Sequence, residues 1–76
     1  MRIEIKKVDQ FWKIFRRTVD SKTIYLGEVY STKDEALKDA KKDRKLCVEF
    51  LGNEAVSDEI TIHEEGTKSW VSIRFP

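Results

Sequence analysis

The stretch from residue 25 to residue 42, YLGEVYSTKDEALKDAKK, most limits what this chain can fold into, because it joins a strand pattern to a helix start. Thr32 is a good N-cap residue, and Glu35 stands three positions later, which is the spacing of a capping box. Apolar residues then recur at helical spacing at Ala36, Leu37 and Ala40. The sequence therefore predicts a helix that begins at Lys33.

Residues 23–30, TIYLGEVY, precede this helix and predict a strand. Because side chains alternate between the two sides of a strand, one set is expected to face the helix: Tyr25, Gly27 and Val29. The other set would lie on the side that the helix leaves free: Ile24, Leu26 and Tyr30. A glycine in the covered set would let the small alanines of the helix approach closely.

Two further strands are predicted before residue 20, and a hairpin is predicted at the end of the chain. Residues 2–8 alternate apolar and charged side chains, and residues 11–19 are rich in aromatic and β-branched residues. Residues 59–65 and 69–75 flank Gly66-Thr67 and predict a terminal hairpin. The helix is expected to run from residue 33 to about residue 50; a charged gap also allows an end near Lys45, with residues 47–51 extended.

These elements predict a single α+β domain over residues 1–76, in the order βββαββ, with a mainly antiparallel sheet and one helix packed on one face. The expected core under the helix is Trp12, Ile14, Val29, Leu37, Ala40, Ile60, Ile62 and Ile73. Val71 and Phe75 are expected to face inward from the last strand.

Composition narrows the class of protein. No apolar run approaches the roughly 18 residues that span a bilayer, and MRIEIKK lacks the apolar centre of a signal peptide, so we expect a cytoplasmic protein without a membrane partner. The net charge is +1, but residues 1–46 carry thirteen Lys and Arg against eight Asp and Glu, and residues 47–76 carry two against six. This asymmetry fits either a surface for a polyanion or charged surfaces that only keep the chain in solution.

The sequence does not favour an enzyme. Adjacent acids such as Glu64-Glu65 point to opposite faces of a strand, so they cannot share a substrate. His63 is expected to be a solvated strand residue, and Cys47 lies on the apolar stripe of the helix, where it reads as a core residue. One Cys and one His are too few for a closed zinc site. We therefore expect no catalytic residue, no metal, no cofactor and no small-molecule substrate.

The sheet face opposite the helix is the better candidate for function, and it suggests a small non-catalytic binding module. One interpretation is self-association or protein binding through apolar residues: Phe11, Phe15, Ile24, Leu26, Tyr30 and Trp70. The alternative is nucleic-acid binding, in which bases stack on aromatic rings while cations meet phosphates, on strand 11–19 and its neighbours. Its candidates are Lys13, Phe15, Arg17, Tyr25 and Arg74.

Two family resemblances accompany these patterns. Residues 11–42, with Leu26-Gly27, the Thr32 cap and Glu35-Ala36, resemble the arm-type DNA-binding domains of tyrosine recombinases and the plant ethylene-response-factor domain. That resemblance implies a sheet inserted into the major groove, with Lys13, Phe15, Arg17 and Tyr25 nearest to DNA. The Trp12 to Ile14 strand, the Thr32 to Ala36 helix start and the Ile60 to His63 strand are also similar to a small bacterial domain family of unknown function, which implies a fold but no activity.

Overall fold

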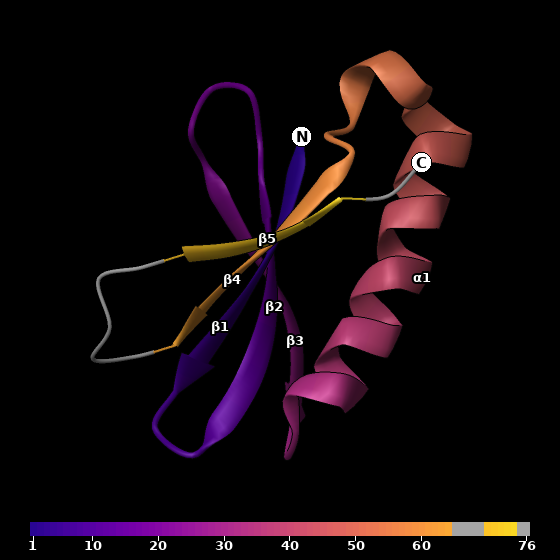
Figure 1. The fold of residues 1–76 in the computed structure, drawn as a ribbon. Helices are drawn as coiled ribbons and strands as arrows, with labels where there is room; N and C mark the ends of the chain where they lie inside the picture. The colour runs from indigo at the N-terminus through magenta and orange to yellow at the C-terminus, as the bar shows by residue number, and fades with distance from the viewer. Residues whose placement is uncertain (65–69, 75–76) are drawn as a thin grey trace.

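The computed structural model confirms the predicted α+β class and the order of the strands and the helix (Figure 1). It describes residues 1–64 and 70–74, without the side chain of Trp70; the predicted turn at Gly66-Thr67 and the inward-facing Phe75 lie outside the described residues. The elements are β1 (Arg2–Val8), β2 (Phe11–Arg17), β3 (Thr23–Tyr30), α1 (Lys33–Leu51), the short 3-10 turn η1 (Asn53–Ala55), β4 (Glu59–Glu64) and β5 (Trp70–Arg74). The helix continues to Leu51, so the longer of its two predicted ends is correct and residues 47–51 are not an extended segment.

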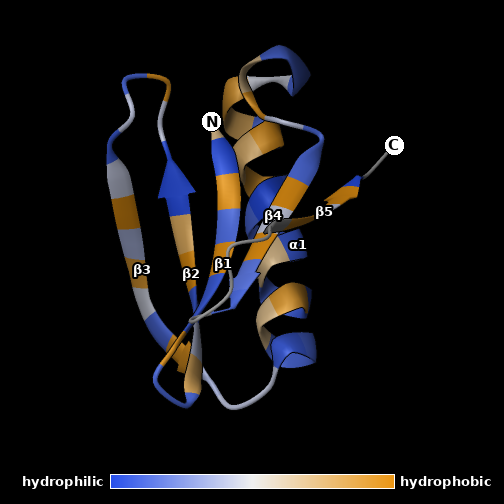
Figure 2. Ribbon diagram, turned by 60° about the vertical axis from the view of Figure 1, so that its left-hand side comes forward, coloured by the Kyte–Doolittle hydropathy of each residue, from blue (hydrophilic) through white to orange (hydrophobic). Residues whose placement is uncertain are grey.

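The five strands form one sheet in the order β3-β2-β1-β4-β5, which Figure 2 shows from left to right with α1 behind. All neighbouring strands pair antiparallel except β1 and β4, which run parallel. Because β3 also runs in the direction of β1, the connection from β3 through α1 to β4 is a crossover between parallel strands. The first strand of the chain therefore lies at the centre of the sheet.

The core lies between α1 and the inner face of the sheet, by which we mean the face turned toward the helix. Its largest fully buried side chains come from β1, β2 and β4, and each is at most 2% exposed: Ile3, Ile5, Ile14 and Ile60. The helix contributes Ala36 and Ala40, both 0% exposed, whose small side chains allow α1 to approach the strands closely. Val56, after η1, also belongs to this core.

Local signals at both ends of α1 explain its bounds. The Oγ1 atom of Thr32 accepts a hydrogen bond from the backbone N–H of Glu35 at 3.2 Å, as the capping-box spacing predicts. At the other end, Gly52 has φ of +87°, a conformation that favours glycine, and its N–H donates to the Val48 carbonyl at 2.8 Å. No helix in the described part of the chain is both long and apolar enough to cross a membrane.

The predicted orientation of β3 is wrong. Leu26 and Tyr30 pack against the core, and the Tyr30 hydroxyl donates to Asp39 of α1 at 2.8 Å, whereas Val29 is 54% exposed. Residues directly opposite each other on paired strands share a face, and Tyr30 lies opposite the buried Trp12. Pairing with β2 therefore turns the even-numbered residues of β3 toward the helix and the odd-numbered residues away from it.

The remaining predicted core residues divide into two groups. Trp12, Ile14, Ala40, Ile60 and Ile62 are buried as predicted. Leu37 and Ile73 are only partly buried against this cluster, and Val71 is 61% exposed although its register with Ile62 places it on the inner face. Most of the buried core side chains on the sheet therefore come from β1, β2 and β4, and the β5 side chains are less buried.

Candidate functional site

The outer face of the sheet, which is the face turned away from α1, carries charged and aromatic side chains. Strand register assigns its members, because residues opposite each other on paired strands share a face: Arg2, Glu4, Lys6 and Val8 on β1, Phe11, Lys13, Phe15 and Arg17 on β2, Thr23, Tyr25 and Val29 on β3, Glu59, Thr61 and His63 on β4, and Ser72 and Arg74 on β5. Figure 2 looks onto this face and shows hydrophilic residues alternating along β1 with hydrophobic ones. Four of its cations lie on the adjacent strands β1 and β2.

An aromatic pair lies near the centre of the β2–β3 part of this face. Phe15 and Tyr25 are opposite each other in the register, and their ring centroids are 5.3 Å apart with the planes tilted by 34°. The Tyr25 hydroxyl donates to the Glu28 carbonyl at 3.2 Å, which restricts the orientation of that ring. With Tyr25 43% exposed, the pair presents ring surface that a planar ligand can contact.

Two lysines flank this pair. The Nζ atom of Lys6 lies 5.0 Å from the Phe15 ring centroid, and the Nζ atom of Lys13 lies 5.5 Å from the Tyr25 centroid. These are cation–π distances, and the two lysines are also opposite each other across β1 and β2. The arrangement concentrates positive charge beside the rings.

A second pair of cations lies at the other end of the same strands. Arg2 and Arg17 are opposite each other on β1 and β2, and both line a surface hollow of about 480 Å³ together with Thr18 and Ser57. Like charges placed directly opposite each other in a sheet repel. Glu4, which pairs with Arg17, and Glu54, which also lines the hollow, reduce this repulsion only in part.

Glu4 connects the two pairs of cations. It is 3% exposed, its Oε1 atom accepts from Arg17 Nε at 3.3 Å, and it lies 3.9 Å from Lys6 Nζ. Beside it in the register is Thr61, which is 6% exposed and whose Oγ1 atom makes no hydrogen bond with the described residues. Glu4 neutralises only part of the charge, so this half of the face remains cationic.

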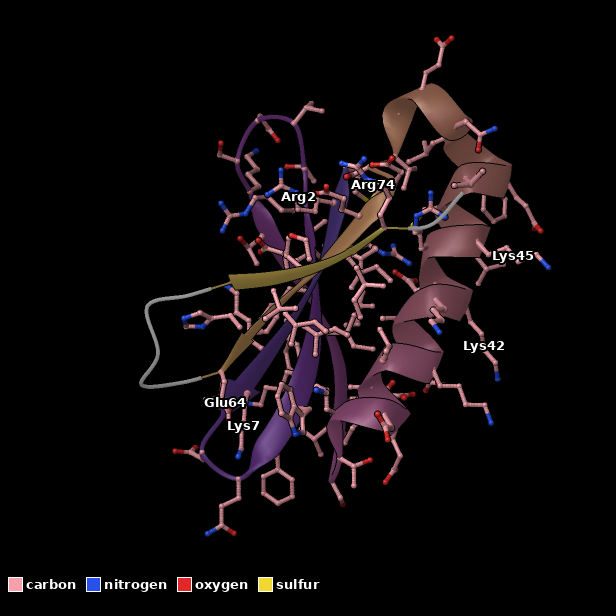
Figure 3. All side chains as sticks on the ribbon, viewed as in Figure 1. Arg2, Lys7, Lys42, Lys45, Glu64 and Arg74 are labelled. Carbon is pink, nitrogen blue, oxygen red and sulfur yellow. The ribbon has the colours of Figure 1, made fainter. Side chains whose placement is uncertain are left out.

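Arg74 lies on the edge strand β5, and β4 separates it from Arg2 on β1, although the two labelled side chains project close together in the view of Figure 3. Its guanidinium contacts Glu59 at 2.9 Å and Asp58 at 3.7 Å. The hydrogen bond that Arg74 donates to the Glu59 carboxylate and the charge of Asp58 raise the pKa of Arg74. Two acidic neighbours make Arg74 a poorer site for an anion than Arg2 or Lys13, neither of which forms an ion pair within the described residues.

The structure therefore separates the two sets of predicted site residues. Four of the nucleic-acid candidates share one region of the outer face: Lys13, Phe15, Arg17 and Tyr25. The predicted apolar interface is divided, because Phe11 and Phe15 are on the outer face whereas Ile24, Leu26 and Tyr30 are on the inner one. The side chain of Trp70 lies outside the described residues.

Sequence reasoning missed Arg2 and Lys6 as site residues. Their alternation with Ile3 and Ile5 was visible in the sequence, and it placed them on the face opposite the core. The short turn at Asp9-Gln10 predicts that these two strands pair antiparallel, and the structure confirms that pairing. What was missing was the register of β1 with β2, which brings Lys6 next to Phe15.

Of the residues considered for catalysis, His63 lies on the outer face and Cys47 lies in the core. Cys47 is 5% exposed in the core, as predicted, and burial raises the pKa of its thiol. Among the described residues, no group of three or more His, Cys, Asp or Glu side chains could hold a metal ion. No family model matches the chain, and neither a curated protein nor a solved structure is significantly similar to it. The chemistry of the outer face therefore carries the functional inference.

Proposed function

We propose that this protein binds single-stranded nucleic acid on the outer face of its sheet. The observation that carries the proposal is the Phe15–Tyr25 ring pair, with a lysine within 5.5 Å of each ring centroid. Aromatic rings on a sheet accept stacked bases, and neighbouring Lys and Arg side chains meet the phosphates of the same strand.

The spacing of the cations fits a strand that crosses the ring pair. Lys6 and Lys13 form one opposed pair, and Arg2 and Arg17 form the other, four residues away along each strand. At about 3.3 Å per residue the two pairs are about 13 Å apart. Phe15 lies between them on β2, so a base stacked on the rings would have phosphates reaching cations on both sides.

Stacking on these rings requires an unpaired base. In a duplex the faces of the bases are covered by their neighbours, whereas a single strand can turn a base out onto a protein ring. This chemistry favours a single strand over a duplex.

Self-association through the outer face is less well supported. Leu26, the most suitable aliphatic residue of the predicted interface, packs against the core instead. Two copies of the outer face brought together would oppose the four cations of each on β1 and β2, and like charges across an interface oppose association.

Fluorescence anisotropy with a labelled single strand of about 12 nucleotides tests the proposal. At ~50 mM salt, where surface attraction is strong, the full chain is expected to bind, and four phosphate contacts give a log–log salt slope of about −3. The Lys13→Ala and Arg17→Ala double variant is expected to weaken binding and bring the slope to about −1.5.

The matched control is the Lys33→Ala and Lys38→Ala double variant, which removes the same charge from exposed positions on α1. It is expected to bind as the wild type does. Absence of binding at ~50 mM salt, or equal losses in both double variants, would contradict the proposal. Tighter binding of the matching duplex would contradict its single-strand specificity.

A further inference from the structure

A surface hollow lies at the end of the outer face where β1 begins and β2 stops. Arg2 is the first residue of β1, and Arg17, opposite it, is the last residue of β2. Both line the hollow of about 480 Å³, and its other walls include the turn after β2 and residues 54–57 before β4. Figure 3 shows Arg2 at the opposite end of the sheet from Lys7. A nucleic-acid strand that follows β1 and β2 past the ring pair therefore reaches this hollow where the sheet ends.

Arg17 is oriented by one hydrogen bond that leaves most of its donors available. Its Nε atom donates to Glu4 Oε1 at 3.3 Å, and Glu4 is only 3% exposed. The two terminal nitrogens of Arg17 form neither a hydrogen bond nor an ion pair with residues that the structure describes. A guanidinium group carries five N–H donors, so four of them can still bind an anion.

Arg2 and Ser57 add further donors to the same hollow. Arg2 is exposed and forms no ion pair within the described part of the chain. The Ser57 hydroxyl oxygen accepts from the Glu59 backbone N–H at 3.1 Å, and its own proton is donated to no described residue. Glu54 is the acidic residue among the lining residues, so two guanidinium groups face one carboxylate. This donor set matches the oxygens of a phosphate group.

We propose that this hollow binds a phosphate monoester, and the proposal rests on the function given above because the monoester is the terminal phosphate of the bound strand. A terminal phosphate carries a charge of about −1.5 to −2 at pH 7, whereas each internal phosphate carries about −1. Two neighbouring guanidinium groups, those of Arg2 and Arg17, favour the more highly charged group. The turn at Thr18 and Val19 follows β2 directly and lines the hollow, so the end of a strand fits there better than its middle.

Fluorescence anisotropy with end-modified probes tests this proposal on the full chain. One sequence of about 12 nucleotides is labelled either at its 3′ end or at its 5′ end, and each form is made with and without a phosphate on the unlabelled end. At ~50 mM salt, the phosphate is expected to lower the dissociation constant at least about 10-fold at one of the two ends. The two labelled forms show whether the hollow takes the 5′ or the 3′ phosphate.

Substitutions in the hollow test where the phosphate binds. Arg2→Ala is expected to reduce the preference for the phosphorylated probe to below about threefold, and Arg2→Lys is expected to restore only part of it because lysine lacks the forked donors. Glu54→Gln removes the acidic group from the hollow and is expected to raise the preference. The matched control is Lys13→Ala, which removes one cation from the other opposed pair. It is expected to weaken the binding of all four probes and to leave the preference unchanged.

The outcomes distinguish this proposal from the function on which it rests. If phosphorylated and unphosphorylated probes bind equally, the terminal-phosphate site is overturned while single-strand binding stands. An equal gain from a phosphate at either end would show a general effect of charge and would also overturn it. So would a preference that Arg2→Ala and Lys13→Ala reduce equally, or one that Glu54→Gln lowers. If none of the four probes binds, the proposed function fails and the terminal-phosphate site fails with it.

Discussion

The two faces of β1 and β2 differ in what their side chains do. On the inner face Ile3, Ile5 and Ile14 are at most 2% exposed and hold the sheet against α1. On the outer face the alternate positions include four cations, the buried Glu4 and the Phe15 ring, turned away from the helix. The same two strands therefore supply stability on one side and a candidate binding surface on the other. Substitutions on the two faces should change different measurements.

The largest expected effect is on the inner face. Ile5 is 0% exposed at the centre of the sheet, so Ile5→Ala would lose buried apolar contacts and leave a cavity. We expect a loss of about 2 to 5 kcal/mol in the free energy of unfolding, measured by urea denaturation. This is a large part of the stability of so small a domain. A loss below about 1 kcal/mol would show that the inner face is not close-packed there.

The next largest effect is expected on the outer face, in binding rather than stability. Tyr25→Ala would remove one ring of the stacking pair. The loss of one stacking ring costs about 1 to 3 kcal/mol of binding free energy. The affinity for the single-stranded probe should fall about 5- to 150-fold in the anisotropy assay. The urea midpoint of Tyr25→Ala serves as the control and should match that of the wild type. A lower midpoint would mean that the variant loses binding because it unfolds, and the result would then not distinguish the outer face from the inner one.

A smaller effect is expected at the junction between the inner face and α1. Burial and the carboxylates of Asp39 and Glu28 raise the pKa of Tyr30 above its usual value of 10.0. The neutral hydroxyl is therefore favoured in the folded state, and its stabilisation is complete below pH 10 and lost at higher pH. Tyr30→Phe should cost about 0.5 to 1.5 kcal/mol at neutral pH, and the gap from wild type should narrow in melts above pH 10. A difference in unfolding free energy between wild type and Tyr30→Phe that stays constant above pH 10 would contradict this account.

The smallest effect is expected at Val29, which simple alternation assigns to the core and the structure leaves 54% exposed. Val29→Lys should change the free energy of unfolding by no more than about 0.5 kcal/mol. A much larger loss in urea denaturation would mean that β3 presents its odd-numbered residues to the helix after all.

The sequence was sufficient to predict those elements whose capping residues, hydrophobic pattern and packing all favour the same structure. Thr32 and Glu35 predicted where α1 begins, and Ile3 and Ile5 among charged neighbours predicted the buried side of β1. Lys13, Phe15 and Arg17 were also assigned correctly to one face, because Trp12 and Ile14 were the better core residues. In each case local pattern and tertiary packing favour the same structure.

Prediction failed at β3 because both of its sides carry apolar residues. Alternation alone cannot choose between Tyr25 with Val29 and Leu26 with Tyr30, and the choice depends on the register with β2. Arg17 pairs with Thr23 beside the turn, which would have placed Leu26 on the same side as Ile14. Gly27, with φ of +89°, lies in the irregular part of β3 that follows, so its small size serves the backbone and not the approach of the helix.

The parallel pairing of β1 with β4 has a consequence for how the chain folds during synthesis. Ile3 of β1 pairs with Ile60, so the centre of the sheet depends on contacts between distant parts of the sequence. When α1 has just left the ribosome, β1 is still an edge strand with one row of backbone groups unpaired. Its two most buried residues, Ile3 and Ile5, are then only partly covered. A nascent chain stalled at that point would expose an unpaired strand edge, which β4 covers once it has been translated.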